Sequence, residues 1–309
     1  AAPNRGVPPA FFLPPNTEMR AGGTVTHSDL TSRFEALVST PTAPFREEWM
    51  CDVVDDLLRE IPGVRVTVDR YGNRMARLTR GRPAGPPLIF VAHMDHPGFV
   101  FPRSGALGKP SSNNTFLCEA RFEGRVKDDF FPQSPVRLFR SAEDEGIPGK
   151  IIRASRVDPK VDQRHIFIET SEDPTGAVLG MWDVPVFSNT NGLYRARVCD
   201  DLLGCAAMLQ ALDDLARSDD PVDVTMLFTR AEEAGFCGML CILNDQELLA
   251  EFDQQAIFVS VEISGETPEN RLGSGAIIRV GDRSTTFDGE MANFLWSAAV
   301  SAGTNARRA

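Results

Sequence analysis

Fully apolar runs and helically spaced apolar residues alternate along this chain, and together they predict its secondary structure. Residues 88–92 are entirely apolar, which is typical of a strand covered on both faces of a sheet. Two further stretches rich in apolar residues, 222–229 and 257–261, predict the next strands. The alternation of strands and helices indicates an α/β fold with helices on both faces of the sheet. Apolar residues at helical spacing predict a helix over 201–217, and two shorter helices are expected over 235–243 and 246–252.

The residues before this pattern divide into an irregular start, two helices and a hairpin. Residues 1–23 are rich in proline and are expected to form an irregular lead-in. Ser28 is a suitable N-cap for the first helix, and Pro62 and Gly63 end the second. The predicted helices are 28–38 and 46–60, and the predicted hairpin strands are 64–68 and 75–78.

The sequence pattern changes between residues 104 and 191, and the new pattern predicts a small all-β insertion. Short β-like runs such as 136–139, 150–153 and 165–168 are separated there by Gly, Pro, Asp and Ser. We therefore expect a catalytic α/β domain made of 24–103 and 192–309, interrupted by a β-rich domain over 104–191.

Composition and charge exclude several classes of function. The 309 residues carry a formal net charge of -11 with a pI near 4.9, which opposes binding to a phosphate backbone. The sequence has no apolar run of about 20 residues, the length a membrane-spanning helix needs. Six scattered cysteines do not form the dense framework of a small secreted domain. We expect a cytoplasmic protein that binds neither nucleic acid nor membrane.

The end of the first apolar run carries the first sign of chemistry. His93 and Asp95 are two residues apart, so in an extended chain their side chains lie on the same side. Asp95 can then hold the far nitrogen of the imidazole, as carboxylates do beside metal-binding histidines. The pattern is typical of a metal hydrolase.

Three acidic groups follow at comparable positions. Asp200 and Asp201 open the helix 201–217, while Glu232 with Glu233 and then Glu262 follow the next two predicted strands. In open α/β sheets ligands bind beyond the carboxyl ends of the strands, so we expect one shared crevice and a dinuclear metal centre.

Within this centre, we predict Asp200 as the carboxylate that bridges the two ions, Glu232 as the general base and Glu233 as a ligand. The alternative is chance, because 43 acidic residues guarantee some pairs, and Asp200 and Asp201 could simply favour a helix N-terminus.

From about Leu30 onward, ordered blocks in the chain resemble the cytoplasmic dinuclear aminopeptidases of the glutamyl-aminopeptidase and tetrahedral-aminopeptidase family. The blocks are Tyr71-Gly72-Asn73, Ala92-His93-Met94-Asp95, Asp200-Asp201 with Gly204-Cys205, Phe228-Thr229 with Glu232-Glu233, and Glu262 to Pro268. The resemblance implies a three-layer sandwich of the zinc-exopeptidase type, with a central mixed β-sheet. It also implies a homo-oligomer assembled through the insertion domain.

The resemblance further implies site roles and a reaction. His93, Asp200 and Glu262 would hold one divalent ion, and Asp200 and Glu233 would begin the site of a second, with zinc expected and cobalt or manganese as alternatives. Asp95 would orient His93, and Glu232 would act as base in the hydrolysis of N-terminal peptide bonds.

One departure from the family concerns its last metal ligand, a histidine near the C-terminus. The last histidine of this sequence is His165, so we expect a chain truncated at its C-terminus. Two rival functions follow: an aminoacylase or deacylase-type amidohydrolase with equivalent ligands, and a catalytically inactive assembly subunit.

Overall fold

The computed structural model describes residues 27–111, 114–158, 161–282 and 285–309. The lead-in predicted over 1–23 lies outside these residues. Contacts divide the chain into two compact units, of which one is Val25–Ile263 and the other contains Ser264–Ala309.

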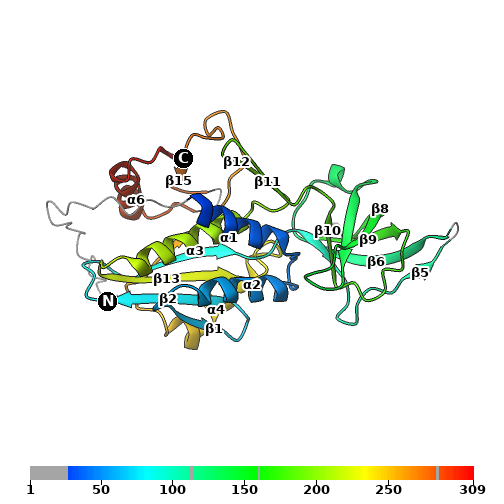
Figure 1. The fold of residues 1–309 in the computed structure, drawn as a ribbon, viewed down its shortest axis with the longest axis horizontal. Coiled ribbons are helices and arrows are strands. Elements are labelled where there is room, and N and C mark those ends of the chain that lie inside the picture. Colours follow the sequence, from blue (N-terminus) through cyan, green and yellow to red (C-terminus); the bar gives the residue numbers. More distant parts are fainter. Residues whose placement is uncertain (1–26, 112–113, 159–160, 283–284) are drawn as a thin grey trace, which may run out of the picture. The chain divides into compact units, whose positions relative to one another are not determined.

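The first unit is built around a five-stranded mixed sheet with the order β1-β2-β13-β3-β14 (Figure 1). The three predicted apolar strands are neighbours and run parallel, so that Thr229 lies opposite His93 and Ser260 opposite Val91. Their carboxyl ends therefore meet at one edge of the sheet. The strands are β1 (Arg65–Val68), β2 (Arg74–Arg80), β3 (Leu88–His93), β13 (Val222–Thr229) and β14 (Ile257–Ser260).

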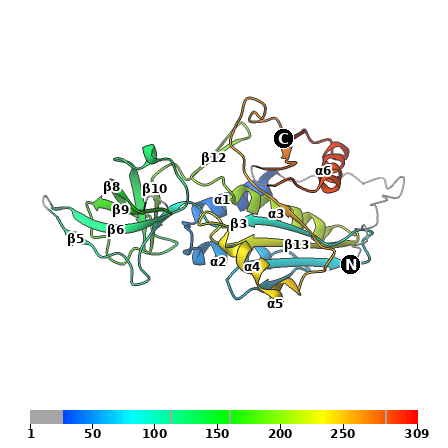
Figure 2. The same ribbon diagram turned by 180° about the vertical axis from the view of Figure 1, so that it is seen from behind.

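Helices cover both faces of this sheet, which confirms the predicted α/β class. Along β13, Val224, Met226 and Phe228 pack into a core with one group of helices, while Leu227 packs into a second core with the other. The alternation follows from the two-residue repeat of a strand. The first group comprises α1 (His27–Ser39), α2 (Glu48–Arg59) and α3 (Leu202–Arg217). The second comprises α4 (Cys237–Asn244) and α5 (Gln246–Leu249), both visible in Figure 2.

The insertion forms an antiparallel sheet with the order β4-β10-β7-β8-β9-β6-β5, and an additional β4–β6 pairing closes it into a barrel. Inward-facing residues such as Phe99, Phe122 and Leu138 fill the barrel as a separate core. The strands are β4 (Gly98–Val100), β5 (Lys109–Pro110), β6 (Phe116–Glu123), β7 (Pro135–Phe139), β8 (Ile147–Asp158), β9 (Val161–Thr170) and β10 (Leu179–Trp182), with a 3-10 turn η2 (Asp128–Phe130).

The barrel strands begin at Gly98, before the predicted start of the insertion at residue 104. Beyond the barrel, β11 (Phe187–Thr190) and β12 (Leu193–Ala196) form a hairpin. Its Phe187 and Tyr194 pack against Phe34 of α1, in the core of the five-stranded sheet. The predicted division into domains at these boundaries remains a prediction.

The C-terminal unit contains β15 (Ala276–Ile278), α6 (Gly289–Ser301) and β16 (Ala306–Arg308). β15 and β16 pair in parallel, and the Asp288 side chain caps α6 by accepting a hydrogen bond from the Met291 N–H. Across the residues that the structure describes, no helix combines the length and apolar character needed to cross a membrane.

Candidate metal centre

The predicted site residues converge at the carboxyl edge of the parallel strands. His93 ends β3, Glu232 and Glu233 lie in the turn after β13, Glu262 follows β14, and Asp200 precedes α3. Ligand atoms of His93, Asp200 and Glu262 all lie within 4.8 Å of one another, and those of His93, Glu232 and Glu233 do the same. The two groups share His93.

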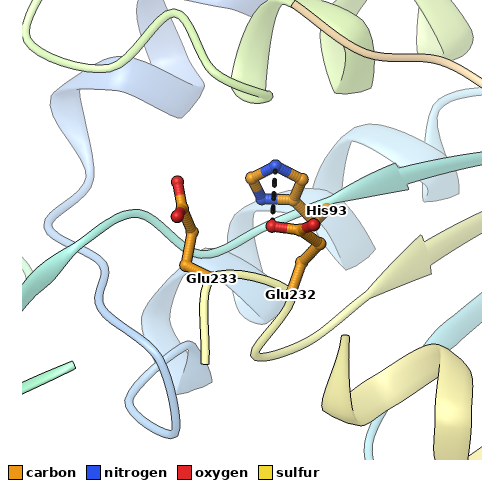
Figure 3. A group of neighbouring side chains, drawn as sticks. All are labelled: His93, Glu232 and Glu233. Atoms are coloured by element: carbon orange, nitrogen blue, oxygen red, sulfur yellow. Dashed lines mark ion pairs between the residues drawn. The ribbon is translucent and has the colours of Figure 1, made fainter. Parts of the chain in front are cut away.

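His93 is buried, with only 4% of its side chain exposed, and its two ring nitrogens have different surroundings. Nε2 lies 3.2 Å from Asp200 Oδ1 and 3.7 Å from Glu232 Oε2. Figure 3 marks the Glu232 ion pair and shows both glutamates projecting from one turn. Nδ1 lies 3.1 Å from the backbone oxygen of Asp95. Burial opposes protonation of His93, but hydrogen bonding to Asp200 and Asp95 outweighs it and raises the pKa to about 12.

The Asp95 carboxylate lies 3.6 Å from His93 Nδ1, and its closest hydrogen bonds go elsewhere. Its two oxygens accept hydrogen bonds from the backbone N–H groups of Glu232 at 2.9 Å and Glu233 at 3.0 Å. The side chain is fully buried, so these charge-assisted bonds compensate the cost of burying it. Asp95 therefore contacts the imidazole mainly through its backbone and holds the glutamate turn with its side chain.

Asp200 and Asp201 are adjacent but lie in different environments. The Asp200 side chain is 44% exposed, and although burial opposes ionisation, its hydrogen bond to His93 lowers its pKa. Asp201 is fully buried, and neither carboxylate oxygen has a hydrogen-bond partner among the described residues. Burial, with nearby Glu262 and Asp200, raises the Asp201 pKa to about 8 despite the opposing effect of His93. A side chain at position 204 would collide with this carboxylate, which explains Gly204 in the first turn of α3.

The remaining carboxyl groups of the centre also resist ionisation. Burial is the main cause, and it raises the pKa of Glu233 to about 8 and that of Glu262 to about 7, with a further contribution from Asp200 in each case. Burial likewise raises the pKa of Glu232. Carboxyl groups that are close together and partly buried resist ionisation, and a bound cation would stabilise their ionised form.

The donor set fits a divalent cation. One imidazole nitrogen and several carboxylate oxygens are ligands typical of zinc, cobalt and manganese sites. In the metal-free chain the Asp200 Oδ1 atom lies 3.2 Å from His93 Nε2, and both atoms belong to the first group. A divalent ion bound there would replace the proton between them, because metal ligands must be deprotonated.

Two other histidines do not join the cluster. His96 lies beside Asp200, and burial lowers its pKa to about 4. His165 belongs to the barrel, where it pairs with Glu119 across two strands. Sequence reasoning missed the contribution of Glu47 and Asn73, which bind the backbone of the turn after β13. Asn73 stood in a block that resembles the family but was given no role there, and Glu47 stood at a predicted helix start.

Comparison with known protein families supports a hydrolase of peptide bonds. Residues 175–308 match the model of the family described as M42 glutamyl aminopeptidase. This match confirms the family resemblance predicted from the sequence and the class of enzyme that it implies, a hydrolase of peptide bonds. A search of curated proteins found no match.

Solved structures share the fold at low sequence identity. An aminopeptidase from the archaeon Desulfurococcus kamchatkensis is 18% identical with a TM-score of 0.68, covering 91% of this chain and 79% of its own. The TET1 peptidase of Pyrococcus horikoshii is 20% identical with a TM-score of 0.67, covering 90% and 83%. A TET aminopeptidase from a marine-sediment Thaumarchaeota archaeon is 18% identical with a TM-score of 0.66, covering 91% and 81%. At these identities the likeness establishes the fold alone.

Proposed function

We propose that this chain is a metal-dependent aminopeptidase that removes N-terminal residues from peptides. The observation that carries the proposal is the convergence of His93 with carboxylates from three other segments, at the strand edge where α/β enzymes bind their ligands. The family match over residues 175–308 supplies the reaction class.

The proposed ligands of the first ion are His93, Asp200 and Glu262, which meet the usual requirement of three protein ligands for catalytic zinc. Asp200 and Glu233 would begin a second site, with Asp200 as the bridge. We propose two divalent ions, zinc in the first place and cobalt or manganese otherwise. When bound, such ions polarise a carbonyl group and make a water molecule more acidic.

Glu232 is the proposed general base. It stands beside the ligand Glu233, and its carboxylate lies within 3.7 Å of the imidazole without belonging to the Asp200 group. Its pKa is raised by burial, which moves it toward the neutral range where a carboxylate can both accept and return a proton. Glu232 would take a proton from the attacking water and deliver it to the leaving amine. Asp95 keeps Glu232 in place by accepting a hydrogen bond from the Glu232 backbone N–H.

A second candidate, an inactive assembly subunit, is favoured by one observation. Both ligand groups use His93, and a single Nε2 atom can bind one ion. The described residues therefore complete one site more fully than the other. The aminoacylase or deacylase alternative uses the same ligands and differs in its substrate, an N-acylated amino acid in place of a free amine.

We also propose a homo-oligomer that acts in the cytoplasm. The Pyrococcus horikoshii relative is described as assembling into a tetrahedron or a large octahedral shell. The barrel domain is the proposed contact surface, as the family resemblance implies.

The test is a substrate panel with the full chain supplied with Zn²⁺ or Co²⁺. Peptides with a free N-terminus should be cleaved, while N-acetylated peptides of the same sequence and N-acyl amino acids should not. Cleavage of N-acyl amino acids alone would favour the aminoacylase reading, and no turnover with metal bound would favour the inactive subunit. The native mass measured on the same sample tests the oligomer.

A further inference from the structure

The turn that carries Glu232 and Glu233 is held by side chains from outside it. Four consecutive backbone N–H groups, from Arg230 to Glu233, each donate a hydrogen bond to a buried side-chain oxygen. The acceptors are Asn73 Oδ1 at 3.0 Å, Glu47 Oε1 at 2.9 Å, Asp95 Oδ1 at 2.9 Å and Asp95 Oδ2 at 3.0 Å. The acceptors come from three separate segments, so the turn is fixed relative to each of them.

Among these acceptors, Glu47 is the one whose position the rest of the structure explains least. Its side chain is fully buried, and it lies at the start of α2 without capping that helix. Its Oε1 also accepts the Phe45 N–H at 2.9 Å, while Oε2 lies 2.6 Å from Arg230. Burying a carboxylate is costly, so its retention here requires several compensating bonds. One of these bonds is donated by the N–H of Ala231, the residue directly before Glu232.

Ala231 has a backbone conformation that needs such support. Its φ is +50°, in the left-handed region, which is unfavourable for an L-residue with a side chain. The hydrogen bond that the Ala231 N–H donates to Glu47 holds this conformation, and the conformation sets the direction in which the next two side chains leave the backbone.

We propose that Glu47 is a positioning residue for the metal centre, acting through the Ala231 N–H to aim Glu232 and Glu233 at His93. The proposal rests on the proposed function, because it assigns Glu47 to the same site. Groups of this kind, which bind the neighbours of ligands, typically contribute about 10–100-fold to metal affinity or activity.

Two conservative substitutions separate this role from a purely structural ion pair with Arg230. Glu47→Gln keeps the length and the accepting oxygen but removes the charge. Glu47→Asp keeps the charge but is one methylene too short to reach Ala231. Arg230 also lies 3.5 Å from Glu48 and is partly exposed, so it is not left unpaired by Glu47→Gln.

The readout is titration of the metal-free full chain with Co²⁺, followed by its visible absorption. Positioning predicts that Glu47→Asp weakens Co²⁺ binding about tenfold or more, whereas Glu47→Gln stays close to the parent. Deuterium exchange of the backbone amides in the segment 230–233 should be faster in Glu47→Asp than in the parent, and in Glu47→Gln it should stay close to the parent. In the cleavage assay, Glu47→Asp should lower kcat with little change in KM.

Asp213→Asn provides the matched control. Asp213 is another buried carboxylate paired with arginines, Arg33 at 2.8 Å and Arg217 at 2.9 Å, but it lies about 16 Å further along α3 than its first turn. Its substitution should leave Co²⁺ binding unchanged.

Several results would overturn the proposal: equal Co²⁺ affinity in parent and Glu47→Asp, a larger loss in Glu47→Gln than in Glu47→Asp, or an equal loss in Asp213→Asn. Failure of both Glu47 variants to fold, beside a folded Asp213→Asn, would also overturn it. A parent chain that does not bind Co²⁺ would instead reject the proposed function, and exchange in 230–233 would still decide whether Glu47 holds the turn.

Discussion

Two histidines of this chain lie beside carboxylates, one in the mixed sheet and one in the barrel, and their surroundings differ. The side chain of His165 in β9 is 45% exposed and pairs with Glu119 of the antiparallel neighbour β6. The side chain of His93 at the end of β3 is 4% exposed and meets Asp200, Glu232 and Asp95. The residue types are the same, but only the second arrangement fits a metal ion.

The difference comes from strand direction. Neighbouring strands in the barrel are antiparallel, so their carboxyl ends alternate between its two rims. A pair of side chains on adjacent strands therefore does not gain further partners from other strand ends. β13, β3 and β14 are parallel, so the turns that follow them lie side by side. Acidic residues placed in these turns then converge on His93 without being close in sequence.

The largest effect that separates the two regions should come from removing each imidazole. We expect at least one divalent ion per purified parent chain, measured by elemental analysis. His93→Ala should lose it, since both ligand groups depend on this residue, and Glu262→Ala should weaken it. His165→Ala should retain the ion because its exposed pair with Glu119 belongs to no such group. Equal metal content in His93→Ala and the parent would show that the ion does not bind at the proposed site in the mixed sheet.

The next effect concerns turnover. Glu232→Gln keeps the shape of the side chain but cannot take a proton, so kcat in peptide cleavage should fall about a hundredfold or more. Metal content should stay close to that of the parent, because Glu233, His93, Asp200 and Glu262 are unchanged. Glu119→Gln in the barrel is the control and should leave kcat unaltered. Unchanged turnover in Glu232→Gln would exclude it as the base.

The sequence was informative where apolar patterns and strand ends coincide. Stretches rich in apolar residues predicted β3, β13 and β14, with boundaries within one residue of those observed. The order of strands and helices then indicated one edge at which His93, Asp200, Glu233 and Glu262 could meet. These inferences depend only on local pattern and on a general rule of sheet topology, so they did not require the tertiary structure.

Other features could not be predicted, for a physical reason. The barrel closes through β4, a three-residue strand whose pairing with β6 leaves no periodic signal in the sequence. The hydrogen bonds of Asp95, Glu47 and Asn73 to the turn 230–233 depend on how separate loops approach one another. Glu47 looked like an ordinary acidic residue at a helix start, and only its burial reveals another role.

The smallest effect should appear in the pH dependence of stability near neutral pH, and it arises from the mixed-sheet region. In metal-free protein, Glu233 and Asp201 have pKa values raised to about 8 and Glu262 to about 7, so the folded state keeps protons that the unfolded state releases. Stability from these groups is therefore lost as pH rises from about 4.5 to about 8. His93, raised to about 12, adds a loss that begins above its ordinary value of 6.5. His96, whose pKa is lowered to about 4, opposes this loss up to its ordinary value of 6.5. The Tm in chelator should therefore fall most clearly between pH 6.5 and pH 8.

Added Co²⁺ should reverse this trend, since the ion competes with protons for the same ligands and binds more tightly as they leave. The Tm gained on adding Co²⁺ should thus grow from pH 6 to pH 8. Glu233→Gln removes one titrating group, so its Tm in chelator should fall less steeply, whereas Glu119→Gln in the barrel should follow the parent. A Tm that stays level or rises across this range without metal would contradict the clustering of protonated carboxyl groups at the strand edge.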